Sequence, residues 1–185
     1  MCIISEPVDL VSSTHILVGI DDKGQRQLTV YSNKVSNRND GNAMILPVPN
    51  PQSVKLIDLT NYKSIFDDCK KDFINTSKSK NRYFGFTNSR SADDSLEVHK
   101  VGSYSVSIAQ NLADLSRADR KVFRMDDGCR RLLEKDYADG TGFGFLICKL
   151  DLGDKEYHPL AYSHLIMGGR YFVPTKHYHA ESNLY

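Results

Sequence analysis

Residues 43–48 read AMILPV, and this stretch is the best guide to the fold. An apolar run without alternation is typical of a strand that is buried on both faces. Proline lacks the backbone N–H that a sheet needs, so Pro47 and Pro49 predict that the strand ends at a sheet edge or leaves the sheet. A comparable run at residues 144–150, GFLICKL, is expected to form another strand.

The chain before this stretch predicts a β-hairpin. Residues 15–20 (HILVGI) are rich in β-formers, and residues 26–32 (RQLTVYS) alternate between apolar and polar side chains. The turn between them, residues 21–24, contains glycine, as hairpin turns commonly do. Residues 33–42 follow and are expected to form a polar loop.

Three short helices are expected along the rest of the chain. Apolar residues recur at spacings of three and four between residues 62 and 73, which predicts one helical stripe with Thr60 as its N-cap. The other two helices are expected at residues 112–123 and 127–137, and Gly140 should end the second of these.

The remaining strands decide the predicted fold class. They are expected at residues 55–59, 96–109, 158–164 and 170–175. Because strands outnumber helices and follow one another in hairpin-like order, we expect an α+β fold, mostly antiparallel β, sandwich-like or with a mixed sheet, and three short helices. A length of 185 residues fits a single domain, 1–185. Its predicted core contains Met44, Ile45, Leu46, Phe66, Val106, Phe145 and Ile147.

A polar insert interrupts this domain at about residues 75–95, and its Ser, Asn and Lys content predicts mobility. It contains Arg82, Tyr83, Phe84 and Phe86, a mixture of rings and positive charge that can hold single-stranded nucleic acid. The whole chain is nearly neutral, with 24 Lys and Arg against 23 Asp and Glu. That balance gives no general attraction to nucleic acid or to anionic membranes, so no nucleic-acid partner is expected.

Two absences bear on localisation. The longest apolar runs are far too short to span a membrane, and the N-terminus lacks the basic start and apolar run of a signal peptide. The four cysteines, at positions 2, 69, 129 and 148, do not have zinc-finger spacing. We therefore expect a protein of the cytoplasm or of a virus particle, with reduced cysteines.

The order of several motifs resembles the uncharacterised bacterial family called domain of unknown function 2330. Cys2 stands before a first strand, and Ala43–Pro49 matches an apolar strand that ends in Pro-Val-Pro. Val101–Val106 then leads through two short helices to Gly144–Leu150, followed by His158-Pro159-Leu160. The likeness covers about residues 40–165. It implies a shared fold and transfers no catalytic residue.

Cys2 is the sharpest single candidate for catalysis. Removal of Met1 would expose it as an N-terminal nucleophile whose own α-amine acts as the base. The start MCII also resembles the opening of N-terminal-nucleophile hydrolases of the glutamine-amidotransferase type. Those proteins carry an Asn-Arg-Asp motif on a later strand, whereas residues 37–40 here read Asn-Arg-Asn-Asp in an expected loop. The alternative is a cysteine that only packs into the first strand.

Histidines near the C-terminus are the second candidate site. His177 and His179 are two residues apart, so on a strand both side chains would point to one face. His164, on a neighbouring strand, could complete a three-histidine site for zinc or another divalent ion. The alternative is a pair of partly exposed histidines at a strand end.

No catalytic constellation emerges from the remaining residues. The leading hypothesis is therefore a non-enzymatic protein-binding or structural assembly module, a component of a virus particle or of a large cellular assembly, without a cofactor. The alternatives are a thiol hydrolase that uses Cys2 and a zinc protein that uses His164, His177 and His179. The expected partners are other proteins or further copies of the chain.

Overall fold

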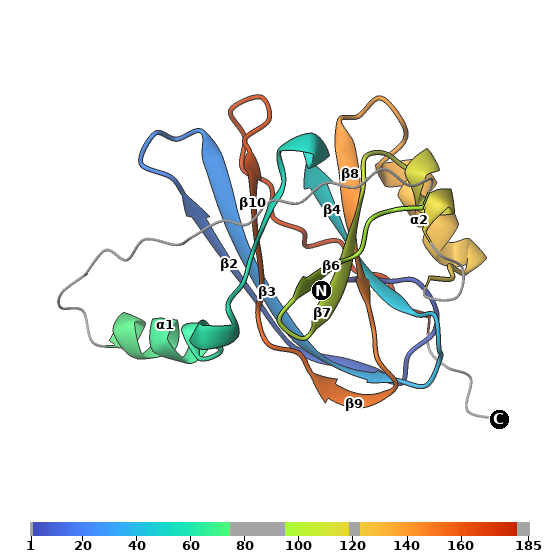
Figure 1. Cartoon of the computed structure of the whole chain (residues 1–185), viewed down its shortest axis with the longest axis horizontal. Coiled ribbons are helices and arrows are strands. Elements are labelled where there is room, and N and C mark those ends of the chain that lie inside the picture. Colours follow the sequence, from blue (N-terminus) through green and yellow to red (C-terminus); the bar gives the residue numbers. More distant parts are fainter. Residues whose placement is uncertain (1, 75–94, 119–122, 181–185) are drawn as a thin grey trace.

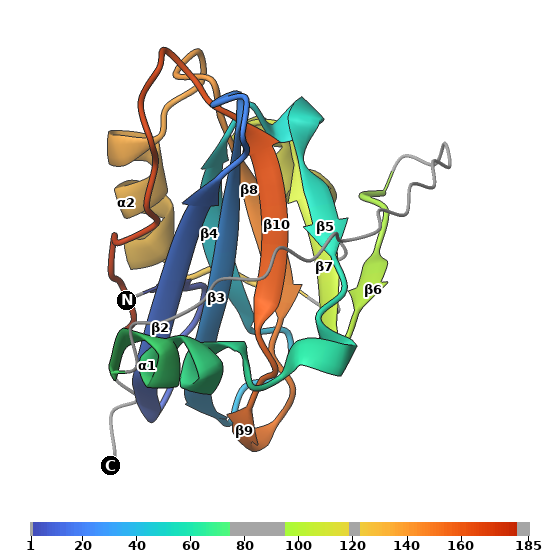
Figure 2. The same cartoon turned by 90° about the vertical axis from the view of Figure 1, so that its left-hand side faces the viewer.

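A computed structural model describes residues 2–74, 95–118 and 123–180, and it contains two antiparallel sheets. The sheets face each other as layers, with α2 (Asp127–Asp136) outside one and α1 (Ile65–Ile74) beside the other (Figures 1 and 2). The β4–β8 sheet contains, in order, β1 (Ile3–Ile4), β4 (Ala43–Pro49), β8 (Phe143–Lys149), β7 (Tyr104–Ala109) and β6 (His99–Val101). The β3–β10 sheet contains β2 (Leu10–Ile20), β3 (Arg26–Asn37), β10 (Leu160–Leu165) and β5 (Lys55–Ile57), with β9 (Gly153–Glu156) also paired to β3.

The strand β4 is buried on both faces, as its sequence predicts. All seven of its residues are buried, and each pairs with a residue of β8, from Ala43 opposite Lys149 to Pro49 opposite Phe143. The predicted core is confirmed here for Met44, Ile45, Leu46, Phe145 and Ile147, and also for Val106 of β7.

The two prolines of β4 lie where no hydrogen bond is lost. Ser5 donates its N–H to the carbonyl of Ala43, so alternate residues from Ala43 onward direct their backbone groups toward β1. The strand β1 pairs with β4 only at Met44 and Ile45. The missing N–H groups of Pro47 and Pro49 therefore face an edge beyond the end of β1, which confirms the predicted edge position.

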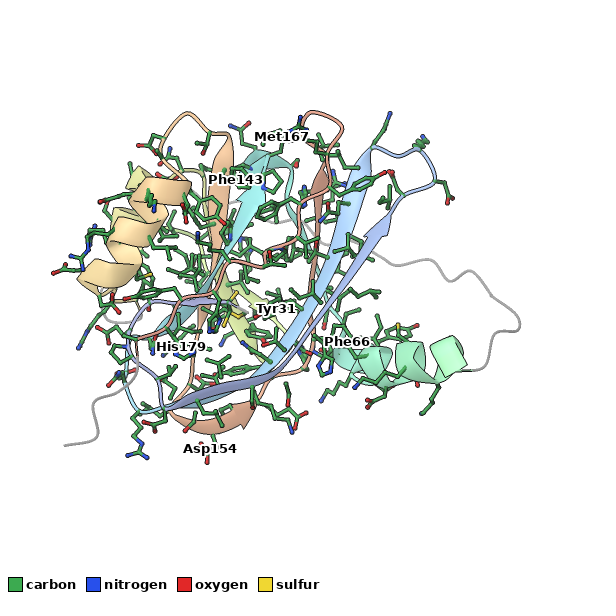
Figure 3. All side chains as sticks on the ribbon, turned by 180° about the vertical axis from the view of Figure 1, so that it is seen from behind. Tyr31, Phe66, Phe143, Asp154, Met167 and His179 are labelled. Atoms are coloured by element: carbon green, nitrogen blue, oxygen red, sulfur yellow. The ribbon has the colours of Figure 1, made fainter. Side chains whose placement is uncertain are left out.

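The main core lies between the two sheets. It combines inner side chains of β4, β7 and β8 with Tyr31, Leu160 and Tyr162 of the facing sheet. Tyr31, in the interior in Figure 3, is fully buried. Leu28 and Val30 of the same strand point to the opposite side, the outer face of the β3–β10 sheet. The apolar side of this strand thus faces outward, while Gln27 and Thr29 are buried on the inner face.

Helix α2 covers the outer face of the β4–β8 sheet. Cys129 and Leu133 on the helix are fully buried against a cluster that includes Ile45 and Phe145. Asp126 caps the helix, since its side chain accepts a hydrogen bond from the N–H of Cys129 over 2.7 Å. The helix predicted at residues 127–137 is therefore confirmed.

Helix α1 covers its sheet less completely, and one core prediction fails here. Phe66 is only half-buried, with its ring 5.3 Å from that of His15 on the outer face of β2 (Figure 3). Of the described side chains of α1, Ile65 and Phe66 in its first turn pack against the apolar cluster on the outer face of the sheet. Thr60 is not the N-cap: it lies in a 3₁₀ turn, η2 (Thr60–Tyr62), and donates to Asp58.

Several other boundaries differ from the predictions. Residues 96–109 form not one strand but the hairpin of β6 and β7, because Gly102 turns the chain. The strand predicted at residues 170–175 is absent, and the described helices number two α-helices and three 3₁₀ turns, including η1 (Pro51–Ser53) and η3 (Ala113–Arg117). The expected mobile insert at residues 75–94 lies outside the described residues.

The expected polar loop at residues 33–42 is only partly a loop: residues 33–37 continue β3, residues 38–42 form the turn to β4, and a buried amide network joins the two. Strand β3 continues to Asn37, and the side chains of Asn37 and Asn42 are hydrogen-bonded to each other over 3.1 Å. Asn42 also accepts from the hydroxyl of Ser5 and donates to the carbonyl of Glu6. These bonds satisfy amides that are almost fully buried, and they join the N-terminal segment to the end of β3.

Two of the motifs in the family resemblance meet at one corner of the sandwich. The N–H of Ser103 donates to Nε2 of His158 over 3.1 Å, and the hydroxyl of Ser103 accepts from the N–H of His158 over 3.3 Å. The imidazole lies where a side chain at position 102 would be: a Cβ on Gly102 would be 1.1 Å from Nε2. This corner joins the β6–β7 hairpin of one sheet to the entrance of β10 in the other.

We predict that Gly102→Ala destabilises the protein by about 1–3 kcal/mol more than Gly24→Ala, as overpacking does. Both glycines have positive φ, 57° and 66°, so the backbone strain of the two substitutions is matched. A Cβ at Gly24 meets nothing within 4 Å. Urea denaturation of both variants measures the difference, and equal losses would contradict the contact with His158.

Candidate functional site

Cys2 lies at the inner face of the β4–β8 sheet, directly before β1. Its side chain is 1% exposed and belongs to the core between the sheets. The amide of Asn33 donates to Sγ of Cys2 over 3.7 Å and to Sδ of Met44 over 3.5 Å. The carbonyl oxygen of the Asn33 amide is buried and has no partner within the described part of the chain.

The protonation of Cys2 follows from this burial. Desolvation raises the pKa of the thiol above its usual value, although side-chain hydrogen bonds with Tyr31 and Asn33 act in the opposite direction. A nucleophilic cysteine needs an accessible thiolate. The arrangement therefore favours a neutral thiol that packs in the core, as the structural alternative for Cys2 predicts.

The backbone nitrogen of Cys2 has a different neighbour. It donates to Nδ1 of His177 over 3.4 Å. The chain around His177 runs beside β1, where Tyr178 donates to the carbonyl of Cys2 and accepts from the N–H of Ile4. The structure thus brings together two candidates that the sequence places 175 residues apart.

His177 and His179 are neighbours in space. Their ring centroids are 4.7 Å apart, edge to face, and Nδ1 of His179 is buried without a partner among the described residues. They lie in an irregular segment and not in the strand that the sequence predicts, with a single bridge between Ile3 and Tyr178.

His164 lies in β10 and takes part in other contacts. Its Nδ1 is 2.9 Å from the carbonyl oxygen of Leu165, and its ring stacks on Tyr162. Within the described ranges, no three His, Cys, Asp or Glu side chains are close enough together to hold a metal ion. The zinc site of His164, His177 and His179 therefore stays a prediction.

The C-terminal segment, residues 166–180, acts as a strap across the sandwich. The amide of Gln27 donates to the carbonyl of Phe172 and accepts from its N–H, which fixes the segment to the β3–β10 sheet. Further along, the hydroxyl of Tyr178 donates to Asp126, the cap of α2, over 2.9 Å. Lys176 forms an ion pair with Asp136 at the other end of that helix. The strap thus connects both sheets and α2.

The outer edge of β2 is a feature that the sequence analysis does not identify. It is called the free edge here, because no described strand pairs with it. Asp21 donates its N–H to Arg26 over 3.0 Å and closes the β2–β3 hairpin. Bonded and non-bonded pairs alternate in an antiparallel ladder, so Ile16, Val18 and Ile20 direct their backbone groups away from β3. In the part of the chain that the structure describes, no backbone group hydrogen-bonds to that side.

The side chains at this edge are apolar. Ile16 packs against the core between the sheets, and Ile20 is 42% exposed at the end of the strand. Edge strands usually carry charges or prolines that prevent pairing with another chain. Residues 16–20 have neither, and this absence of charge is the signal by which the sequence could have indicated an edge used for pairing.

One candidate cannot be placed. Arg82, Tyr83, Phe84 and Phe86, the aromatic and basic group, lie outside the described residues. The helices that are described include none long and apolar enough to cross a membrane.

Comparison with known proteins gives no relative to guide the assignment. No protein-family model matches the chain, and no solved structure matches it. The resemblance to domain of unknown function 2330 therefore stays a prediction that rests on the order of short motifs.

We predict that Cys69 reacts first when the native protein is treated with iodoacetamide. It is half-buried on the marginal helix α1, whereas Cys2, Cys129 and Cys148 are buried. Desolvation also raises the pKa of Cys129 to about 12. Peptide mass spectrometry after short exposure identifies the modified thiol. Early modification of Cys2 in the folded protein would contradict its placement in the core.

The stability of the protein should fall as the pH drops from about 6.5 toward 5. Burial of His164, 1% exposed, lowers the pKa of its imidazole below the usual value, and burial also lowers the pKa of His177. The unfolded chain therefore binds protons in this range that the folded chain does not, so acidification favours unfolding. Urea denaturation across this range measures the slope, and His164→Gln should flatten it. A stability that rises on acidification would contradict this prediction.

Proposed function

We propose that the protein is an assembly module in which two copies of the chain pair through the free edge of β2. The observation that supports this proposal is the backbone of Ile16, Val18 and Ile20, which has no hydrogen-bond partner on its outer side among the described residues. An unpaired strand edge is a template for a further strand.

The geometry of such a pair follows from the ladder. Two copies of β2 run antiparallel around a twofold axis at Val18, so Ile16 of one copy lies opposite Ile20 of the other. All three residues then direct their N–H and carbonyl groups toward the partner strand. The two β3–β10 sheets become one continuous sheet, and the interface uses the same surface on each copy, as closed dimers require.

The side chains support this register. Residues 16–20 carry no charge, so like charges do not oppose each other across the axis. The exposed side chain of Ile20 would be covered by Ile16 of the second copy. A β-bulge limits the paired length, because the register of β2 shifts between Ser12 and His15 and Ser13 has a φ of 52°.

We expect Ile20→Lys to weaken self-association about tenfold or more, because it places a charge in an apolar strand interface. Leu152→Lys is the matched control: Leu152 is also an exposed leucine-sized residue, 53% against 42% for Ile20, and it lies before β9, on the opposite side of β3 from β2. Sedimentation equilibrium over a range of concentrations measures the dissociation constant of each variant.

A second variant tests the backbone directly. Val18→Pro removes one N–H from the free edge and no hydrogen bond to β3, so it should also weaken association. A wild-type chain that stays monomeric at every concentration would contradict the proposal. So would an Ile20→Lys variant that associates as strongly as Leu152→Lys.

The contact between the nitrogen of Cys2 and His177 favours a second candidate function, a thiol hydrolase that uses Cys2. After removal of Met1, this imidazole would lie beside the α-amine and could take up its proton. The buried thiol with its raised pKa argues against this role. Intact mass decides first, because retention of Met1 excludes an N-terminal nucleophile.

A further inference from the structure

A cleft opens at one end of the sandwich, and its lining includes none of the candidates Cys2, His177 and His179. Its walls come from the β2–β3 turn, the loops after β4, β7 and β10, and the loop before β8, so both sheets contribute. Figure 3 marks this end of the molecule by Met167, which lies in the loop after β10. The cleft has a volume of about 640 Å³, within the range of sites for small molecules.

The lining, within the described residues, carries no charged side chain and combines apolar surface with amide groups. Among the described residues that form it are four carboxamides, Gln25, Asn50, Gln52 and Gln110, and none with a charged side chain. A carboxamide supplies both N–H donors and a carbonyl acceptor. A hydroxyl group is also donor and acceptor, so this lining matches a ligand rich in hydroxyls. A charged ligand would lose hydration here without meeting an opposite charge among the described lining residues; the nearby guanidinium of Arg26 is already bonded to the carbonyl of Ser53.

The floor of the cleft is held in place by hydrogen bonds between loops. Asn50 donates its N–H to the carbonyl of Gly142 over 3.1 Å and its side-chain amide to the carbonyl of Leu165 over 3.0 Å. The hydroxyl of Ser53 donates to the carbonyl of Asn50 and accepts from the N–H of Leu165. Such fixed loops lower the entropy cost of binding.

Three amides remain available above this floor. The side chains of Gln25, Gln52 and Gln110 are exposed and form no hydrogen bond within the described part of the protein. Leu165, which is 43% exposed, and the half-buried Ile166 add apolar surface beside them, against which the C–H face of a sugar ring could pack. We propose that this cleft binds a neutral saccharide, of the size of one or two sugar units.

A glycan array that carries neutral and acidic saccharides, probed with the full chain, tests the proposal. We expect binding to one or more neutral glycans. Titration calorimetry with the corresponding free neutral saccharide then gives the affinity. Gln52→Ala and Gln110→Ala should each weaken it about tenfold, because each removes hydrogen bonds to the ligand.

Asn61→Ala is the matched control, because Asn61 is an exposed amide in η2, outside the cleft. Its affinity should equal that of the wild type, and the thermal stability of all three variants should be unchanged. The proposal is overturned if no neutral saccharide binds, if only charged saccharides bind, or if both glutamine variants bind as strongly as Asn61→Ala. Self-association through β2 does not affect these outcomes, because the cleft is lined by residues other than those at the free edge.

Discussion

The pairing of β4 with β8 is the interaction on which the rest of the structure depends. Seven consecutive residue pairs join these strands, and both faces of β4 are buried. One face forms the core with Tyr31 and Tyr162 of the opposite sheet, and the other is covered by α2. A shift of one residue would exchange these two faces, so the packing of every other layer requires this register.

Closure of the sandwich depends on polar contacts between segments that are distant in the sequence. The amide of Gln27 forms two hydrogen bonds with the backbone of Phe172, and Tyr178 bonds both to the backbone of Cys2 and to the cap of α2. At the other end, Asn37 and Asn42 hold the N-terminal segment. A buried amide is costly unless it is bonded, so these residues also select one arrangement of the chain.

The candidate residues of the sequence analysis are therefore not the residues that form the accessible surfaces of the described structure. The imidazole of His158 occupies the space that a side chain at position 102 would need, and Cys2 packs in the core. Among the described residues, the open features are the outer edge of β2 and the cleft of neutral amides at one end of the sheets. The proposed self-association and the proposed saccharide binding would use separate residues, so the two proposals are compatible.

The sequence by itself determined the strands whose pattern is local. Residues 43–48 and 144–148 are apolar without interruption, and this pattern predicts their burial. The two prolines predict an edge position, and the hairpin-like order of the strands predicts a mostly antiparallel fold. Residues 127–137 likewise carry a helical pattern, whereas the N-cap role of Asp126 is seen only in the structure. Only the tertiary structure decided which side of β3 faces the core, because Leu28 and Val30 are the apolar side and yet lie outside. It also decided that Phe66 is only half-buried, that the nitrogen of Cys2 lies beside His177, and that β2 is an edge strand among the described residues. Each of these features depends on which segments pack against one another. Contacts between segments that are far apart in the sequence produce no periodic pattern within either segment, so the pattern of one segment cannot predict them.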